Sequence, residues 1–396
     1  MIGIIEFLRN PLRDHLTIDP SSRAVLDFHS RMPAYETTLL IDAPNIATSL
    51  GVGRVLVKAE NRRLGLPSFK ILGASWATYR AVVDHLGYEP EPWLNINELA
   101  RHLDHLRPFA LAAATDGNHG RAVAFMARLL GFDARIFVPS GTVAARIDAI
   151  ERENATVTVV DGDYDDAVAR AALEAGDRCL VIADTSWPGY ESTPRRVIEG
   201  YHTIFHEIDD ALDSAGIEQP QIVVVPIGVG ALMAAAVSHY RARTDELLLV
   251  GVEPSDADCV LRSARAGHIE SVPGPHRSIM VGLNCGTPSP LAWPLVSRGT
   301  DWFVAIDDDW ARQAMRSLAG AGVVAGETGA AALGGFAAFA TGPDCAPRRQ
   351  AAAIDDTTTV LVLCTEGATD PVGYRSVVGR DPDSVGRVMT VAGQAK

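Results

Sequence analysis

The sequence has few cysteines, and they do not occur in the spacings in which cysteine usually acts. The 396 residues include five cysteines, an odd number, which are scattered along the chain. No C-x-x-C pair occurs among them. We therefore expect neither a disulfide framework nor a cysteine zinc site, and a reducing cytoplasm is the expected compartment.

Long apolar runs and an excess of basic residues are also missing. No 18 consecutive apolar residues occur, and the N-terminal MIGIIEFLRNPLRD meets a charge early and has no small-residue cleavage site. The 49 acidic and 35 basic residues give a formal charge of −14. Nucleic acids and anionic membranes attract clustered lysine and arginine, so we expect neither as a partner. The composition favours a soluble intracellular enzyme that acts on a small molecule.

Several common catalytic motifs are absent. The sequence contains no G-x-S-x-G elbow and no G-x-x-x-x-G-K-[ST] phosphate loop. The stretch HTIFH (His202–His206) has a metal-ligand spacing, but it lacks the glutamate of the zinc-protease motif. We interpret these histidines as structural and expect no metal site.

What is present is an alternation of strand-like and helix-like segments at about 20–25 residues per unit. This pattern predicts right-handed crossovers and parallel sheets. The expected strands are Phe109–Ala114, Ala134–Val138, Thr156–Val160, Cys179–Ala183, Ile222–Val225, Leu247–Val252 and Thr358–Leu363. The expected helices are Asn118–Leu130, Val143–Glu151, Asp165–Ala175 and Ala231–Arg241.

The length and the two series of segments predict an α/β protein with two lobes. Each lobe should contain an open, mostly parallel twisted sheet flanked by helices. We place the small, mobile domain at 75–187 and the large domain at 1–74 plus 188–396. Because ligands bind beyond the carboxyl ends of parallel strands, we expect a site between the lobes.

A first candidate for chemistry is Lys70, in the stretch LPSFKILGASWATYRAV. It stands at the start of a predicted helix, between Phe69 and Ile71. Loss of water and the positive end of the helix dipole would lower the lysine pKa and make the amine a nucleophile. The alternative is a surface lysine whose stem covers apolar neighbours.

The stretch ATDGNHGRAVA is the second candidate, at a predicted strand-to-helix turn. Gly117 and Gly120 permit a tight turn. Asn118 could cap the helix, and Asp116 could be an ordinary turn residue. His119 alone is more often a packed, hydrogen-bonded imidazole than a base.

The stretch VVVPIGVGALMAAA combines a strand, Gly228-x-Gly230 and a helix. Backbone N–H groups at such a helix start can hold a phosphate. It also resembles the opening of a dinucleotide fingerprint, although Met233 replaces the third glycine. Glu253 stands where a ribose-binding carboxylate would be, so a NAD-dependent oxidoreductase stays an alternative.

Two further stretches, ADTSWPGYEST and LVLCTEGATDP, place polar clusters at the ends of apolar strands. Either could consist of ordinary turn residues. One cofactor would use all of these parts together, because pyridoxal phosphate needs a lysine imine, a phosphate cradle, an amide beside its phenolic oxygen and a polar group at its ring nitrogen.

The stretches SFKILGA, TDGNHGRAVA, GVGA and CTEGATDP, in this order, closely resemble the 2,3-diaminopropionate ammonia-lyases. These belong to the tryptophan-synthase-β-like (fold type II) enzymes that depend on pyridoxal phosphate. The resemblance extends from FHSRMPAYETTLL (Phe28–Leu40) to GATDP. SFK and GNHG mark the wider superfamily, whereas TDGNHG, DTSWPGY and TEGATDP indicate the ammonia-lyase branch.

The resemblance implies roles for the residues that bind the cofactor. Lys70 matches the lysine that forms the imine, and Phe69 beside it is also expected to touch the cofactor. Asn118 matches the residue that bonds the cofactor's 3′-oxygen. Cys364 falls where relatives place a small polar group at the pyridine nitrogen, with Thr365 as the neighbouring candidate. The phosphate loop corresponds to Gly228, Val229, Gly230 and Ala231.

The resemblance also implies the reaction. Asp116 and Asp184 match acid/base groups that would protonate the departing β-amino group of diaminopropionate, giving pyruvate and two molecules of ammonia. A homodimer is expected by the same resemblance. Alternatives are another pyridoxal-phosphate β-eliminase or β-replacement enzyme acting on serine, threonine or a related amino acid, and a binding module that has lost catalysis. Asp116 argues against the first and Lys70 against the second.

Overall fold

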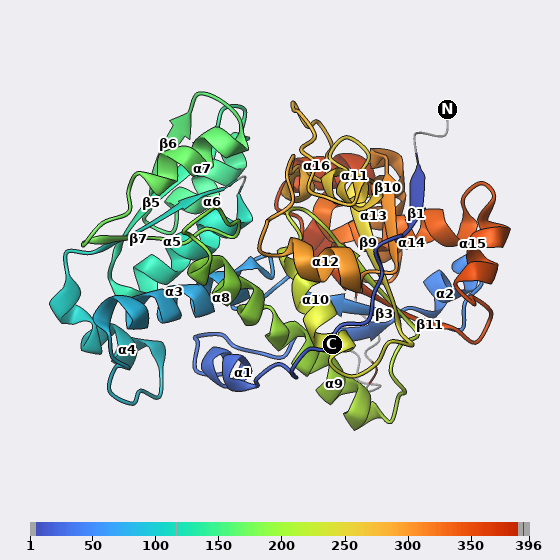
Figure 1. The fold of residues 1–396 in the computed structure, drawn as a ribbon, viewed down its shortest axis with the longest axis horizontal. Coiled ribbons are helices and arrows are strands. Elements are labelled where there is room, and N and C mark those ends of the chain that lie inside the picture. The colour runs from blue at the N-terminus through green and yellow to red at the C-terminus, as the bar shows by residue number, and fades with distance from the viewer. Residues whose placement is uncertain (1–4, 116, 387–390, 392–396) are drawn as a thin grey trace. The chain divides into compact units, whose positions relative to one another are not determined.

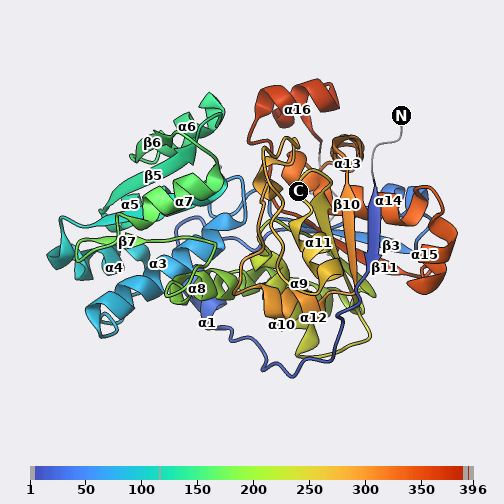
Figure 2. The same ribbon diagram turned by 45° about the horizontal axis from the view of Figure 1, so that its top comes forward.

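The computed structural model describes residues 5–115, 117–386 and 391. Asp116, one of the acid/base candidates, therefore lies outside the described residues. The chain forms two compact units (Figures 1 and 2). Unit 1 comprises Met1–Ser21, Thr37–Arg62 and Ile204–Lys396, and unit 2 comprises Ser22–Glu36 and Arg63–Thr203. The sequence-based limits of a mobile domain at 75–187 stay a prediction.

Unit 1 is built on a seven-stranded sheet in the order β1-β10-β9-β8-β11-β3-β2. The edge strands β1 and β2 pair antiparallel with their neighbours, and the inner strands run parallel. The strands are β1 (Glu6–Arg9), β2 (Leu40–Asp42), β3 (Arg54–Ala59), β8 (Ile222–Pro226), β9 (Leu248–Pro254), β10 (Trp302–Ile306) and β11 (Thr359–Cys364).

Strand β8 of unit 1 is a continuous apolar run, and helices cover the sheet. Every residue of β8, IVVVP, is buried, as expected for a parallel strand that is covered on both faces. Helix α14 packs on β8, β9, β10 and β11, and α10 packs on β8. The helices of this unit are α2 (Pro44–Leu50), most of α9 (His202–Ala215), α10 (Ala231–Arg241), α11 (Cys259–Ala266), α12 (Trp293–Gly299), α13 (Asp308–Gly320), α14 (Glu327–Thr341), α15 (Cys345–Ala351) and α16 (Pro371–Val378), with the short 3-10 turns Val281–Leu283 and Pro382–Ser384.

Unit 2 contains a four-stranded, wholly parallel sheet in the order β6-β5-β4-β7. Its central strand β4 has the sequence ALAAA and is completely buried. The strands are β4 (Ala110–Ala114), β5 (Asp133–Pro139), β6 (Thr156–Val160) and β7 (Cys179–Val181). The helices are α1 (Ala24–His29), α3 (Lys70–Leu86), α4 (Ile96–His102), α5 (Asn118–Leu130), α6 (Ala144–Glu151), α7 (Tyr164–Ala172) and α8 (Ser192–Gly200), with a 3-10 turn at Asp104–Leu106.

These two sheets confirm the predicted α/β class. All seven strands expected from the sequence occur; Thr156–Val160 has the predicted bounds, and the bounds of the others shift by at most two residues. Among the described residues, no helix combines the length and the apolar character needed to cross a bilayer.

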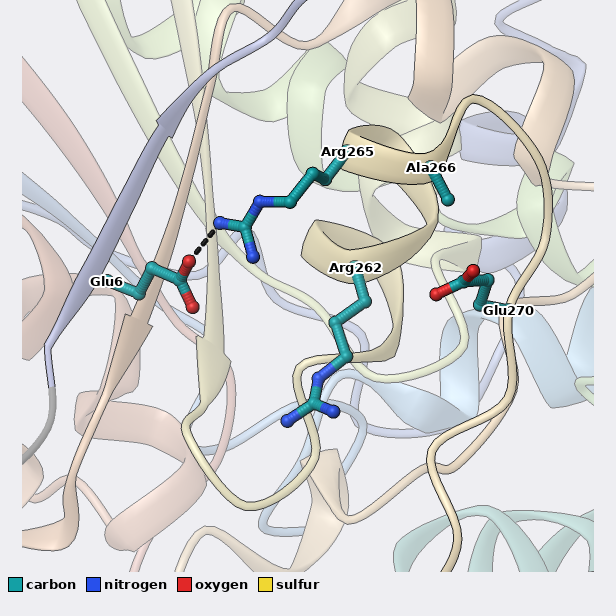
Figure 3. A pocket seen from close by; sticks show the side chains of 5 residues that line it. All are labelled: Glu6, Arg262, Arg265, Ala266 and Glu270. Atoms are coloured by element: carbon teal, nitrogen blue, oxygen red, sulfur yellow. Dashed lines mark hydrogen bonds and ion pairs between the residues drawn. The ribbon is translucent and has the colours of Figure 1, made fainter.

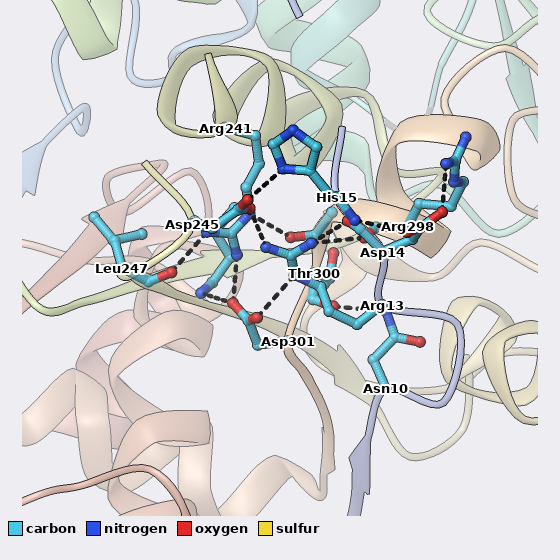
Figure 4. A network of polar contacts seen from close by, with 12 residues as sticks. Asn10, Arg13, Asp14, His15, Arg241, Asp245, Leu247, Arg298, Thr300 and Asp301 are labelled. Carbon is cyan, nitrogen blue, oxygen red and sulfur yellow. Dashed lines mark hydrogen bonds and ion pairs between the residues drawn. The ribbon is translucent and has the colours of Figure 1, made fainter. Parts of the chain in front are cut away.

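The N-terminal segment of unit 1 is fastened by a polar network (Figure 4). Asn10 Nδ2 donates to the carbonyl of Thr300, and Arg13 pairs with Asp301 at 3.0 Å. Arg241 at the end of α10 also pairs with Asp301 and donates to the carbonyl of Leu247 at 2.7 Å. Most of these groups are at least partly buried, so the network fixes the path of the segment that leads out of β1.

Candidate active site

In unit 2, Lys70 is the first residue of helix α3. Its Nζ lies 2.6 Å from Asp184 Oδ2, and it lies 5.6 Å from the centre of the Phe69 ring. The side chain of Lys70 is 22% exposed, so most of it is shielded from water. The amine thus pairs with a buried carboxylate, whereas the alternative described a surface lysine whose stem covers apolar neighbours.

The position of Lys70 depends on close packing between α3 and α8. A Cβ on Gly73, one turn beyond the lysine, would lie 2.6 Å from Tyr201 and 2.7 Å from Val197. A Cβ on Gly200 would lie 2.4 Å from the carbonyl of Leu72. Real side-chain carbons do not approach this closely, so both glycines allow the contact that holds the start of α3.

Asp184 follows strand β7, and three side chains of unit 2 surround its carboxylate. Besides Lys70, the Tyr164 hydroxyl donates to Oδ1 at 3.2 Å, and His119 Nδ1 lies 3.9 Å from Oδ2. Burial opposes ionisation of Asp184, but the charge on Lys70, with smaller contributions from His119 and Tyr164, outweighs it and holds the pKa of Asp184 well below its ordinary value. Asp184 is therefore a carboxylate at neutral pH while Lys70 carries its ammonium charge.

The motif DTSWPGY supports the loop that carries Asp184. Trp187 and Tyr190 form an isolated antiparallel bridge and stack at 4.1 Å between ring centres. The Tyr190 hydroxyl donates to the carbonyl of Val181 and accepts from the amide of Ala183. Burial raises the pKa of Tyr190 to about 12, so its hydroxyl stays protonated and can donate at neutral pH.

The TDGNHG turn leads from β4 into α5, which begins at Asn118. Gly117 occupies the N-cap position, and within the described part of the chain no side chain caps the helix. Asn118 therefore does not cap this helix, which was the alternative role expected from the sequence. His119 Nε2 lies 2.7 Å from the carbonyl of Ile182. Because β4 and β7 are parallel neighbours, this bond ties the turn to the loop that carries Asp184.

In unit 1, the glycine loop joins β8 to α10. Gly230 is the N-cap residue of α10 and has a φ of +102°, a conformation that favours glycine. Among the described residues, no side chain caps this helix. The N–H groups of its first turn thus have the arrangement that binds phosphate at a helix N-terminus.

The end of strand β11 lies beside this loop, because β8 and β11 are parallel neighbours in the sheet. Burial raises the pKa of the Cys364 thiol, and nearby carboxylates raise it further, so the group is neutral. Thr365 Oγ1 donates to the carbonyl of Thr328 at 3.4 Å, and Thr328 Oγ1 accepts from the amide of Gly282. A Cβ on Gly228 would lie 3.2 Å from the Gly282 carbonyl, so these segments gather at one edge of the sheet.

Glu253 does not have the environment of a ribose-binding carboxylate. It is fully buried at the end of β9, and its two oxygens accept the amides of Val260 and Leu261, each at 2.8 Å. These amides belong to the first turn of α11, so Glu253 is engaged in capping that helix. This observation removes the residue on which the NAD-dependent alternative depended.

A pocket elsewhere on unit 1 contains none of the candidate residues (Figure 3). It is lined by Glu6, Arg262, Arg265, Ala266 and Glu270. Arg265 forms an ion pair with Glu6. The two arginines and two glutamates of this lining balance each other in charge, so the pocket offers no net charge to attract a ligand.

The small number of lysines is a further indication of which lysine binds the cofactor, and the sequence motifs do not record it. The chain has three lysines, Lys58, Lys70 and Lys396. Lys58 is fully buried and pairs with Glu207 at 2.6 Å, and Lys396 lies outside the described residues. Tyr164 was also missed, although it follows the end of strand β6, where side chains of a parallel sheet converge.

Comparison with known proteins identifies the class to which this arrangement belongs. Residues 32–365 match the family model described as pyridoxal-phosphate dependent enzyme, and the chain belongs to that family. Its fold is that of the fold type II enzymes, and it depends on pyridoxal phosphate.

Within this class the chain belongs to the diaminopropionate ammonia-lyases. It is 35% identical over 362 residues to the diaminopropionate ammonia-lyase of Escherichia coli K12, covering 89% of each chain, and 32% identical to that of Salmonella typhimurium, covering 89% of this chain and 91% of the relative. A holo crystal structure of the Escherichia coli enzyme superposes with a TM-score of 0.88 and 31% identity, covering 96% of this chain and 97% of that one. A complex of the same enzyme with an aminoacrylate-PLP azomethine reaction intermediate gives a TM-score of 0.85 and 31% identity, with 95% and 97% covered.

Proposed function

We propose that this chain eliminates ammonia from 2,3-diaminopropionate and releases pyruvate and two molecules of ammonia. Family membership over nearly the whole chain supports the reaction. The single observation that carries the proposal is the placement of Lys70, a partly shielded amine 2.6 Å from a buried carboxylate, in a chain that has only three lysines.

Bound pyridoxal phosphate supplies a conjugated ring that takes up the electron pair left when Cα loses its proton. Lys70 would hold the aldehyde carbon, with Phe69 beside it, and Asn118 would bond the 3′-oxygen. The phosphate would bind to the backbone of Gly228, Val229, Gly230 and Ala231. The first turn of α10, which no described side chain caps, fits a phosphate, and the primary amine of Lys70 fits an aldehyde.

The group at the ring nitrogen would be Cys364 or Thr365. Both side chains are buried, and neither carries a charge: one is a thiol with a raised pKa and the other a hydroxyl. A neutral partner does not force a proton onto the ring nitrogen. The ring then withdraws electrons less strongly, which favours direct elimination over transamination or racemisation.

Asp184 would change its proton affinity during the reaction. While Lys70 is an ammonium, the ion pair keeps Asp184 ionised. Once the Lys70 nitrogen gives up that charge, burial is opposed only by the weaker contributions of His119 and Tyr164, so the pKa of Asp184 rises. Asp184 can then accept a proton and pass it to the departing amine, which leaves poorly unless protonated. Asp116, outside the described residues, is proposed as the second acid/base group.

The small number of lysines permits a direct test of the cofactor site. Borohydride reduction of the purified yellow enzyme fixes the cofactor covalently to its lysine, and peptide mass spectrometry then locates the modified residue. We expect the label on Lys70, and we expect Lys70→Ala to lose both label and turnover while the fold survives, as judged by circular dichroism. A label on Lys58 or Lys396, or near-normal pyruvate release by Lys70→Ala, would contradict the assignment.

Substrate preference separates the ammonia-lyase from related eliminases. A panel of both diaminopropionate enantiomers, serine, threonine and O-acetylserine, scored by pyruvate or 2-oxobutyrate release, should show the highest kcat/KM with diaminopropionate. A higher value with a hydroxy amino acid would favour a dehydratase. We also propose a cytoplasmic homodimer, supported by the family resemblance and the scattered cysteines, and light scattering on the purified protein measures the dimer.

A further inference from the structure

Three buried side chains converge on one another at the end of α10 distant from the glycine loop. His206 and Asp209 stand one turn apart on α9, and His239 lies near the last turn of α10. Eight residues separate His239 from the start of α10, which is about 12 Å along a helix. This cluster therefore lies outside the residues proposed to bind the cofactor.

The donor atoms of the cluster are close enough to share one ion. One nitrogen or oxygen from each of the three residues lies within 4.8 Å of the others. His239 Nε2 is 3.0 Å from Asp209 Oδ2. Two ligands of a tetrahedral ion with bonds of about 2.0–2.1 Å are themselves about 3.3 Å apart. His239 and Asp209 are already near this spacing, and His206 would have to move closer by at most about 1.5 Å.

The carboxylate of Asp209 is the second observation that indicates a ligand. Its Oδ2 is buried and accepts no hydrogen bond with proper geometry from the described residues, although His239 and Arg243 lie at 3.0 and 2.6 Å. The ion pairs with Arg243 and His239 therefore supply most of what holds this oxygen. A coordinated cation places no demand on a donor hydrogen, so it can replace Arg243 as the positive charge at this atom.

The surroundings orient both imidazoles. Ser21 Oγ lies 3.4 Å from His206 Nε2 and 3.5 Å from His239 Nδ1. In metal sites, a histidine ligand commonly bonds an outer polar group through its other ring nitrogen, which fixes the tautomer. Ser21 is placed for this role behind both rings.

We propose that His206, Asp209 and His239 bind a divalent first-row transition metal ion of the zinc type, which fastens α9 to α10. Two imidazoles and one carboxylate suit zinc, cobalt or iron rather than magnesium or calcium, which prefer oxygen ligands alone. The sequence pattern HTIFH suggested His202 as the partner of His206 and led us to expect no metal. His202 instead faces the Glu199 carbonyl at 3.0 Å, and the third ligand comes from another helix.

The effect of removing Arg243 distinguishes a metal site from a simple ion pair. Its guanidinium reaches Asp209 Oδ2, but 46% of its side chain is exposed, so it can turn into solvent. Gln219 also lies near this carboxylate, 3.3 Å from Oδ1. If the cluster is only an ion pair among Asp209, His239 and Arg243, no added cation will bind. If it is a metal site, removing the competing positive charge will strengthen binding.

The test uses the tag-free, cofactor-loaded enzyme after chelator treatment and dialysis. Co²⁺ is added while visible d–d absorption is recorded, and Zn²⁺ binding is followed by calorimetry and melting temperature. We expect one ion per chain and a higher melting temperature. Affinity should fall at least about tenfold in Asp209→Asn and His239→Gln, stay unchanged in the control His202→Gln, and rise in Arg243→Gln.

Several results would overturn the proposal. They are the absence of a cobalt band in both wild type and Arg243→Gln, an equal loss of affinity in His202→Gln, or a thiolate-to-cobalt charge-transfer band, which would assign the ion to cysteine. None of these measurements depends on turnover. The metal proposal and the proposed reaction can therefore fail independently.

Discussion

At the scale of single residues, the chemistry of Asp184 depends on which positive charges face it. Lys70 at 2.6 Å lowers the pKa of Asp184 most, the His119 ring with Nδ1 at 3.9 Å lowers it less, and Tyr164 contributes a hydrogen bond. A buried carboxylate with changeable neighbours can switch its proton affinity within one catalytic cycle. This property distinguishes Asp184 from an exposed aspartate in a turn.

Asp116 lies outside the described residues, and its role is tested by a nearly isosteric change. Asp116→Asn keeps hydrogen-bonding capacity but cannot exchange a proton at neutral pH. We expect normal cofactor binding and pyruvate release slowed by about 10²–10⁴-fold, the usual contribution of an acid/base group. The loss should be larger for one diaminopropionate enantiomer, and by family resemblance we expect the D form.

The matched control for this change is Asp133→Asn, an exposed aspartate at the start of β5. It should leave both rates near wild type. If Asp116→Asn also keeps both enantiomer rates within about threefold of wild type, a small effect on the free-energy scale, the residue has a turn role only. The sequence feature that most favours an ammonia-lyase over a dehydratase would then be lost.

At the scale of elements, the glycine loop and helix α10 act as one unit in binding phosphate. Gly230→Val forces a branched residue into a φ of +102° at the helix start. We expect cofactor affinity to fall at least about tenfold, or about 1.4 kcal/mol, when measured by fluorescence titration of the cofactor-free protein.

Gly267→Val is the control for backbone strain. Gly267 ends α11 with a φ of +83° and has no neighbouring atoms within 4 Å of an added Cβ, so the substitution introduces strain away from the loop. It should lower the melting temperature without lowering cofactor affinity. Equal losses of affinity in both variants would show that strain, rather than the phosphate cradle, explains the result.

Glu253 makes the stability of the β9–α11 connection depend on pH. Burial raises the pKa of Glu253 from 4.5 to about 8, despite the two amides that it accepts. The folded state therefore holds this proton more tightly than the unfolded chain. The resulting contribution is fully present below pH 4.5 and is lost as pH rises through about 8.

Glu253→Gln removes this titration. The melting temperature of wild type should fall relative to that of Glu253→Gln as the pH is raised from 4.5 to about 8. Glu218→Gln, at an exposed position, should follow wild type throughout. A constant difference between wild type and Glu253→Gln over this range would mean that the buried carboxyl does not titrate there.

Local patterns in the sequence predicted most elements that carry the candidate site. Lys70 and Asn118 were expected at helix starts, and α3 and α5 begin at these residues. The reason is physical: strand and helix periodicities differ, and polar residues that follow buried strands must lie at one edge of a parallel sheet.

Contacts between distant segments could not be predicted in this way. Tyr164 meets Asp184 because α7, which begins at Tyr164, packs across β5 and β4, and β4 is the neighbour of β7. His239 meets Asp209 across two helices. His29 is a further case, since its ring is fixed by Thr203, 174 residues away. No local periodicity records such pairs, so they appear only once the chain is folded.

At the scale of the whole molecule, the two units differ in how far apart in sequence their partners lie. Unit 2 is complete at Thr203. In unit 1, Glu6 of β1 pairs with Ala305, and Arg54 of β3 pairs with Thr359. The early strands of unit 1 therefore depend on partners from the last third of the chain.

This arrangement sets an order of events on the ribosome. The four-stranded sheet of unit 2 can close as soon as residue 203 has left the exit tunnel. At about 5–20 residues per second, synthesis of residues 204–396 takes roughly 10–40 s, most of it after that moment. During that time β1 is already outside the ribosome before its antiparallel partner β10 is made, and β3 can pair with β2 but waits for its parallel partner β11. Nascent chains of this enzyme are therefore most exposed to aggregation during the second half of translation, when holdase chaperones have their longest opportunity to bind.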